Sequence, residues 1–150
     1  MSNAIKLTEK EIGLLGRLAF ISEAGGLPPM SAKVIALLTV SPVVGLTFDQ
    51  IKDTLGVSKS AISTALTHLQ GLQQVEYSTP LGERKRIFKP ATKDMENFFI
   101  NFLKKLKELS SLYEEILDAR PKDTVEFNNS IRKKIETLSL FNDALKAAMV

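Results

Sequence analysis

The sequence predicts a mainly α-helical fold with a small β wing, namely a winged helix-turn-helix joined to long dimerisation helices. Two observations predict it. Residues 47–90 read as two short helices with a tight turn between them, followed by a basic hairpin. Residues 91–150 read as two long helices with apolar residues three and four positions apart. We expect an N-terminal helix over 1–24 that joins the dimerisation region, the winged helix-turn-helix over 25–90, and a helical dimerisation region over 91–150.

Two helices are predicted before the helix-turn-helix. Thr8 and Glu11 have the spacing of a capping box, which predicts a helix that runs to about Ala24. A second helix is expected from Ser31 to Val40, because Ser41-Pro42 ends helical geometry there. The residues expected to face inward are Ile12, Leu15, Leu18 and Ala19 in the first helix, and Val34, Ile35, Leu37 and Leu38 in the second.

The helix-turn-helix is predicted from its caps. Thr47 and Gln50 form a second capping box, Gly56 ends the first short helix, and Ser58 caps the next one. Apolar residues recur on one face of each helix. They are Phe48, Ile51 and Leu55 in the first helix and Ile62, Leu66, Leu69 and Leu72 in the second.

The exposed face of the second short helix carries hydroxyl groups. Its residues are Ser58, Lys59, Ser60, Ser63, Thr64 and Thr67. Short hydroxyl side chains let a helix enter the major groove, which is about 12 Å wide, and bond to base edges or phosphates. The alternative is that they only cover a solvated face. Because Ser and Thr are poor helix formers, a purely solvated helix would more often use Glu, Lys or Gln. We therefore predict that this face reads DNA.

The wing is predicted from two strand-like runs, 75–78 and 87–88, with a turn at Pro80 and Gly82. Arg84, Lys85 and Arg86 follow the turn. If these three lie in a strand, Arg84 and Arg86 share one side and Lys85 takes the other. Three cations at a hairpin tip suit phosphates or a narrow minor groove. The alternative is a solvated run of charge.

The charge of the chain is concentrated only slightly in the expected DNA-binding module. The formal net charge is +3, with +1 in residues 1–46, +2 in 47–90 and zero in 91–150. A dimer would double the positive charge over one site. The chain has no cysteine, which excludes disulfides and thiol chemistry. It also has no apolar run near the roughly 18 residues of a membrane span and no secretory signal. We expect a cytoplasmic protein without a membrane partner.

Enzymatic function is not predicted. The single histidine, His68, lies within the second short helix, where a phosphate or surface contact is a better interpretation than a catalytic base. No glycine-rich phosphate loop, nucleophile elbow or metal-ligand spacing is present. We therefore expect no catalytic residue, no metal and no cofactor.

The two C-terminal helices carry regular apolar seams, separated at Pro121. Such helices need partners, and the predicted winged helix-turn-helix is too small to cover both. The alternatives are a hairpin within one chain and a homodimeric bundle, of which we favour the second. Twofold symmetry would place two reading helices about 34 Å apart, to match a pseudo-palindromic operator. The seam residues are Met95, Phe99, Phe102, Leu106, Leu109, Tyr113 and Ile116, then Phe127, Ile131, Ile135, Leu138, Phe141 or Asn142, and Leu145.

Three segments together resemble a known family. They are GLPPMSAKVIALLTVSP at 26–42, LTFDQIKDTLGVSKSAISTALTHLQGL at 46–72 and GERKRIFKP at 82–90. They resemble the MarR-type winged-helix transcriptional regulators, and most of all their GbsR-like branch. The resemblance implies a dimeric repressor whose affinity is tuned by a small molecule. Gln73-Gln74 departs from the family, which usually has a glycine there, and suggests that the helix before it runs slightly longer.

The predicted function is sequence-specific binding of double-stranded DNA by a homodimeric transcriptional regulator. The alternative is a winged helix that binds a partner protein and no DNA. A small-molecule effector is a further expectation: Phe98, Phe99, Phe102 and Tyr113 could line a cavity, and aromatic faces attract quaternary ammonium compounds. The alternative for these four residues is packing at helical spacing.

Overall fold

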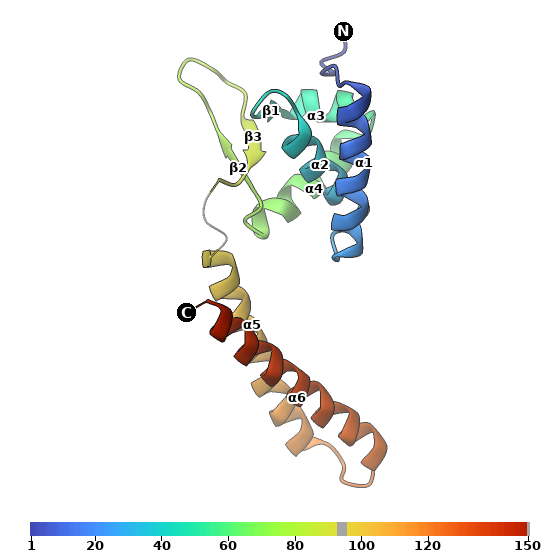
Figure 1. The fold of residues 1–150 in the computed structure, drawn as a ribbon, viewed down its shortest axis with the longest axis vertical. Coiled ribbons are helices and arrows are strands. Elements are labelled where there is room, and N and C mark those ends of the chain that lie inside the picture. Colours follow the sequence, from blue (N-terminus) through green and yellow to red (C-terminus); the bar gives the residue numbers. More distant parts are fainter. Residues whose placement is uncertain (93–95, 150) are drawn as a thin grey trace. The chain divides into compact units, whose positions relative to one another are not determined.

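The computed structural model describes residues 1–92 and 96–149 and divides the chain into two compact units, Met1–Lys93 and Asp94–Val150 (Figure 1). The predicted fold class is confirmed: the chain is mainly helical, with one three-stranded antiparallel sheet. Met95, the first residue of the predicted seam, lies outside the described residues.

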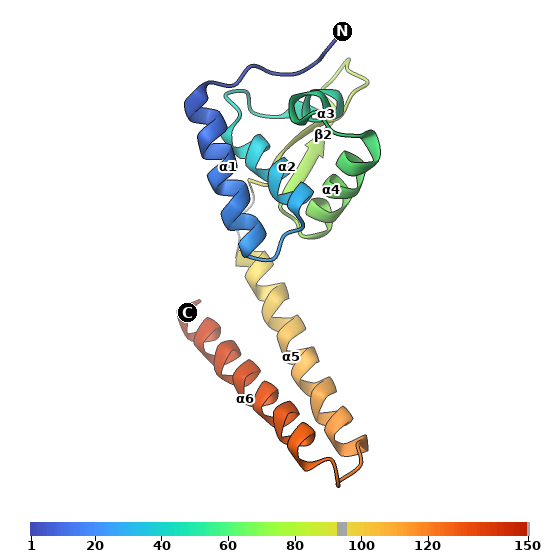
Figure 2. The same ribbon diagram turned by 90° about the vertical axis from the view of Figure 1, so that its right-hand side faces the viewer.

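Helix α1 (Glu9–Ala24) lies along α2 (Pro29–Val40) in the first unit (Figure 2). The predicted capping box at the start of α1 is present, with both hydrogen bonds between Thr8 and Glu11. The two helices meet through the buried small residues Ala19, Ala32 and Ala36. The expectation that Ile12 faces inward is wrong, since it is 57% exposed. Ile12 lies in the first turn of α1, about one turn before Leu15, the first residue of this helix that packs on the core.

Helices α3 (Phe48–Leu55) and α4 (Lys59–Gly71) form the predicted helix-turn-helix. Thr47 and Gln50 make both bonds of their capping box, and the Ser58 hydroxyl accepts from the backbone of Ala61. Gly56 takes the left-handed conformation, with φ of 65°, that ends α3. The core below these helices is apolar and buried. Its members include Val34, Leu37, Leu38, Ile51, Ile62, Leu66 and Leu69.

The sheet forms one side of the first unit, with the order β1-β3-β2. Strands β2 (Val75–Ser78) and β3 (Ile87–Pro90) confirm the predicted wing, and the predicted turn is closed by a 3.0 Å bond from the Glu83 amide to the Pro80 carbonyl. Strand β1 (Leu46–Thr47) was not predicted. It has only two residues, too few for an alternating pattern, and it exists because it pairs with β3.

The end of α4 corrects one expectation. The helix ends at Gly71 and does not run longer before Gln73-Gln74. Gln73 adopts a φ of 58°, a left-handed conformation that usually belongs to glycine. The Gln74 amide donates to the Leu69 carbonyl at 2.9 Å, as in a Schellman ending. Here a glutamine occupies a left-handed position that favours glycine.

The N-terminal arm is attached to α3. The Asn3 amide donates to Asp53 Oδ2 at 2.7 Å, and the Ile5 amide donates to the hydroxyl of Thr54 at 2.9 Å. The bond from Asn3 lowers the pKa of Asp53 below its ordinary value of 3.8, and the neighbouring Lys52 ammonium adds to this effect. Residues before α1 are therefore part of the folded unit.

The second unit is a helical hairpin of α5 (Glu96–Ala119) and α6 (Val125–Ala148), which lie side by side in both views (Figures 1 and 2). A buried polar network closes the turn between them. Asn128 is 2% exposed; its amide donates to the Pro121 carbonyl, while its Oδ1 accepts from Arg120 and Thr124. Arg120 also lies over the ring of Phe127, 4.4 Å from its centroid.

The predicted seam of α6 largely faces α5. Its half-buried or buried members are Ile131, Ile135, Leu138, Asn142 and Leu145. Phe127 and Phe141 are about half exposed, so Asn142 and not Phe141 belongs to the seam. Among the described hairpin residues, Ile131 is the only buried apolar side chain.

The predicted seam of α5 is only partly correct. Leu106 and Tyr113 are half-buried, together with Leu103 and Leu117, which were not predicted. Phe99, Phe102, Leu109 and Ile116 are 36–40% exposed. Helix α5 therefore carries more apolar surface than its neighbour α6 buries.

Candidate nucleic-acid interface

A cleft of about 530 Å³ lies where three elements of the first unit meet: the start of α3, the exposed side of α4, and the segment that precedes β3. It collects five of the nine predicted DNA-binding residues. Its lining consists of Thr47, Phe48, Asp49, Ser63, Leu66, Thr67, Gln70, Arg84, Lys85, Arg86 and Phe88.

Helix α4 contributes three polar side chains to the cleft. Ser63, Thr67 and Gln70 are four and three residues apart, so they follow one side of the helix. Ser63 and Thr67 were predicted, whereas Gln70 was missed. The helical period could have found it, because Gln70 continues the line of the two hydroxyls.

The first turn of α4 is exposed but does not line this cleft. The other four predicted residues are exposed and lie in the N-terminal half of the helix: Ser58 at the N-cap, Lys59 and Ser60 in the first turn, and Thr64 one turn later. The Ser58 hydroxyl already caps α4 and lies 3.3 Å from the hydroxyl of Ser60. These residues therefore form a second exposed group, in the N-terminal half of the helix.

The wing contributes three cations. Arg84, Lys85 and Arg86 are exposed and all line the cleft. The expectation that they alternate between two sides of a strand is wrong in its premise, because β3 begins at Ile87 and the cations precede it. Outside the strand, the backbone is not bound to the two-residue alternation, and the three charges converge.

Arg86 is positioned from the core. Its guanidinium lies 4.4 Å from the centroid of the Tyr77 ring on β2. Tyr77 is in turn the register partner of Phe88 on β3, with ring centroids 5.9 Å apart, and Phe88 is 6% exposed. A buried aromatic side chain thus supports an exposed cation through one intermediate ring. Sequence reasoning assigned Tyr77 to a strand and missed this contact.

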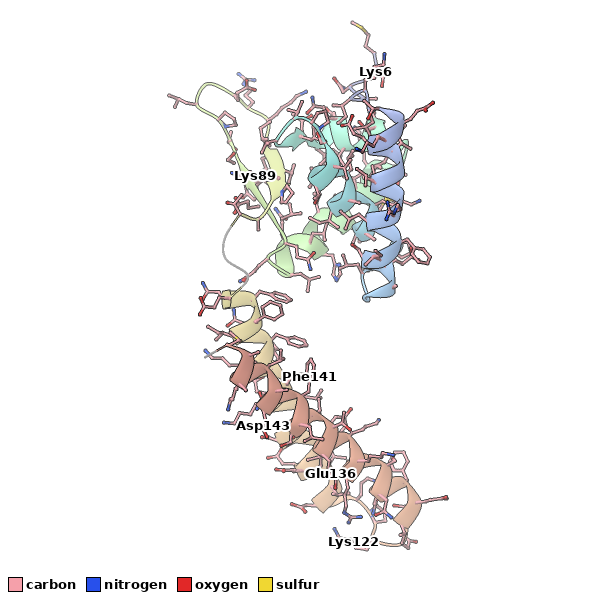
Figure 3. The ribbon with its side chains drawn as sticks, viewed as in Figure 1. Lys6, Lys89, Lys122, Glu136, Phe141 and Asp143 are labelled. Atoms are coloured by element: carbon pink, nitrogen blue, oxygen red, sulfur yellow. The ribbon has the colours of Figure 1, made fainter. Side chains whose placement is uncertain are left out.

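Two ion pairs hold cations near the wing. Lys85 Nζ lies 3.5 Å from Asp49 Oδ2 at the start of α3. Lys89, on β3 (Figure 3), lies 3.5 Å from the Glu76 carboxylate on β2. Asp49 was missed in the sequence, since 36 residues separate it from its partner and no local pattern connects them.

His68 is exposed, but its ring contacts another helix. Its Nδ1 lies 3.3 Å from the hydroxyl of Ser31, which is 2% exposed at the start of α2. The contact joins α4 to α2, so His68 has a structural partner within the first unit.

The four aromatic residues that were considered as the lining of a ligand cavity do not gather at one place. Phe98, Phe99 and Phe102 cluster with Phe141 of α6 (Figure 3), with ring centroids 5.6–6.4 Å apart. Tyr113 lies about 16 Å further along α5, at 1.5 Å per residue, and the Lys134 ammonium lies 5.7 Å from its ring centroid. The phenylalanines pack on each other, as the alternative interpretation expected.

Two further features, metal sites and membrane spans, concern the residues that the structure describes, 1–92 and 96–149. In these ranges no three side chains of His, Cys, Asp or Glu gather in a way that could hold a metal ion. No helix in the same ranges combines the length and the apolar character needed to cross a membrane.

Comparison with known proteins gives structural likeness only. No protein-family model matches the chain. No curated protein matches it either. The crystal structure of a transcriptional regulator matches 93% of this chain and 95% of its own, with a TM-score of 0.73 and 15% identity. This likeness shows the fold.

Two further solved structures match with lower scores. The adhesin competence repressor AdcR from Streptococcus pyogenes has a TM-score of 0.41 and 15% identity, over 93% of this chain and 98% of its own. A single-substitution mutant of MepR from S. aureus has a TM-score of 0.42 and 12% identity, over 89% of this chain and 99% of its own.

Proposed function

We propose that this chain is a sequence-specific DNA-binding transcriptional regulator. The carrying observation is the cleft between α4 and the wing, where Ser63, Thr67 and Gln70 face three cations. The side chains of α4 suit base edges, and the cations suit the phosphates beside them. A helix-turn-helix presents its second helix to the major groove in this way.

The two sets of side chains have separate tasks in this proposal. The cations of the wing neutralise backbone phosphates and supply affinity for any sequence. The polar side of α4 supplies discrimination, since Gln bonds to adenine through N6 and N7 and hydroxyls bond to several base edges. Gln70 is therefore a candidate for contacting a base, together with the hydroxyls of Ser63 and Thr67. The first turn of α4, with Lys59 and Ser60, contacts the backbone or the adjacent bases.

The proposal includes a homodimer. The hairpin of α5 and α6 leaves a line of apolar residues, Phe102, Leu109 and Ile116, exposed at seven-residue intervals. Helix α1 exposes Phe20 and Ile21, at 74% and 67%. The described residues of the same unit cover these side chains only in part. A second copy would bury them and pair two reading helices over a pseudo-palindromic site.

Control of transcription follows from where the dimer binds. A dimer seated over a promoter excludes the polymerase, so we propose repression. The resemblance of residues 26–90 to MarR-type regulators, in particular their GbsR-like branch, supports this part of the proposal. The same resemblance supports regulation by a small molecule. Thermal melts with betaine, choline and aromatic acids test that last element, and the absence of a shift with all three classes contradicts it.

The experiment for DNA binding is a titration of labelled genomic fragments from upstream of the protein's own gene, followed by anisotropy at several salt concentrations. We expect the logarithm of the affinity to fall linearly with the logarithm of salt. Arg84→Ala and Arg86→Ala should each weaken binding to every fragment and reduce the slope by about one unit. Arg132→Ala, an exposed arginine of α6, is the matched control and should change neither value.

The same titration separates the two classes of function. A winged helix that binds a partner protein has no reason to show this dependence on salt with DNA. Absence of any complex with genomic fragments in dilute buffer would exclude the proposed function. Unchanged binding by both wing variants would instead remove the wing from the interface.

A further inference from the structure

Asp49 places a negative charge inside the candidate interface. The other charged residues that line the cleft are Arg84, Lys85 and Arg86, all of them cations. Asp49 Oδ2 lies 3.5 Å from Lys85 Nζ, and the two side chains are 37% and 62% exposed. A cleft suited to phosphates therefore contains a carboxylate that already forms an ion pair with one of its three cations.

The position of Asp49 at the start of α3 explains why an acidic residue is favourable there. It does not explain why the carboxylate contacts the wing. Asp49 lies in the first turn of α3, where the positive end of the helix dipole favours an acidic residue. The cap of this helix is made by Thr47 and Gln50, whose two bonds do not involve Asp49. The carboxylate is thus free to pair with Lys85, which comes from a different element.

The strength of the pair suits a reversible contact. Ion pairs between exposed side chains are weak in water, because both charges keep most of their hydration. A backbone phosphate that enters the cleft can therefore replace Asp49 as the partner of Lys85. The displaced carboxylate remains near the phosphate and repels it. The two like charges lie closer together than a Debye length, so salt does not fully screen the repulsion.

We propose that Asp49, on α3, acts as an electrostatic gate for the wing. It holds Lys85 in an internal ion pair and thereby lowers the affinity of the protein for the phosphate backbone of DNA of any sequence. The inference rests on the proposed function and adds a residue that tunes it. The phosphate contacts supply nearly all non-specific binding. When Asp49 weakens the contact between Lys85 and a phosphate, binding to DNA of arbitrary sequence becomes weaker. The base contacts of α4 then supply a larger share of the affinity.

The test uses the full chain and a labelled duplex of arbitrary sequence, in anisotropy titrations from about 50 mM to about 200 mM salt. Asp49→Asn removes the charge with little change of shape. We expect it to bind about fivefold more tightly at the lowest salt, with a gain that shrinks as salt rises, because exposed charges interact modestly and are screened. Asp143→Asn on α6 (Figure 3) is the matched control, with the same change of charge outside the cleft.

A double-mutant cycle identifies the partner. In a Lys85→Gln background the gain from Asp49→Asn should be clearly smaller, because the ion pair is already absent. Equal gains in the two backgrounds would overturn the gate. Circular dichroism and thermal melts of each variant check that the fold is intact.

The outcomes separate this inference from the proposed function. If the wild-type protein binds and Asp49→Asn binds equally well or more weakly, the gate is wrong while DNA binding stands. Weaker binding would indicate that Asp49 accepts a hydrogen bond from DNA, as carboxylates do from cytosine N4. If no variant binds any duplex in dilute buffer, both proposals fail.

Discussion

The two units of this chain differ in how they bury apolar surface. In Met1–Lys93, the helices and the sheet enclose a core whose members, such as Leu37, Ile51 and Leu69, are fully buried. In the hairpin, among residues 96–149, one apolar side chain is buried and many large ones are at least one third exposed. Hydrophobic burial supplies most of the free energy of folding. The comparison teaches that the first unit buries an apolar core of its own, whereas the described residues of the hairpin leave much apolar surface exposed, which supports the proposed dimer.

The largest expected effect tests the core of the first unit. Leu37→Ala removes a side chain with 0% exposure, so we expect a loss of about 3 kcal/mol in the free energy of unfolding. Urea unfolding followed by circular dichroism measures it. Leu81→Ala in the wing, where the side chain is fully exposed, is the control and should cost less than about 0.5 kcal/mol. A loss at Leu37 as small as the one at Leu81 would contradict the packed core.

The second prediction tests the partner of the hairpin. Ile116→Glu puts a charge on the exposed apolar line of α5, and we expect it to convert a dimer to a monomer in sedimentation velocity. Ser111→Glu lies five residues earlier, about 140° around the helix, and should leave the dimer intact. A wild-type monomer, or an Ile116→Glu dimer of unchanged affinity, would show that this line is not the interface.

The third prediction concerns the turn of the hairpin. Asn128→Ala removes the buried amide that accepts from Arg120 Nε and donates to the Pro121 carbonyl, so we expect a loss of about 1–2 kcal/mol in the free energy of unfolding. The exposed neighbour Asn129 provides the control, since Asn129→Ala removes only a surface contact. Equal melting temperatures for the two variants would indicate that the network does not stabilise the hairpin.

The smallest effect is a gain in the first unit. Gln73 has a φ of 58°, which is unfavourable for residues with a Cβ atom. Gln73→Gly should therefore raise the free energy of unfolding by about 0.5–1 kcal/mol, part of the gain being offset by the greater entropy of glycine in the unfolded chain. Gly71→Ala is a useful contrast, because Gly71 is helical and a Cβ there meets open space. A loss of stability in Gln73→Gly would show that the relief of strain is smaller than the entropic cost of glycine.

Much of the fold could be predicted because its signals are local. The capping boxes at Thr8 and Thr47 and the turn at Gly82 depend on neighbours within a few residues, and all are present. The two-residue strand β1 could not be predicted, since only its pairing with β3 defines it. The end of α4 was misjudged because Gln73 adopts a conformation that its side chain disfavours.

The candidate site shows the same division. The hydroxyls of α4 and the cations of the wing were identified from the sequence, because helical spacing and a run of charge are visible along the chain. Their convergence on one cleft was not, and neither was the pairing of Lys85 with Asp49. The support of Arg86 by Tyr77 depends on the register of two strands.

The sequence by itself determined the order of the elements, their caps and the amphipathic character of each helix, because these depend on residues within one or two turns. Only the tertiary structure decided which apolar faces are covered. It also decided which charges meet, because such contacts join residues tens of positions apart. For this protein, the cleft and the uncovered line of α5 belong to that second class, and both proposals about function follow from them.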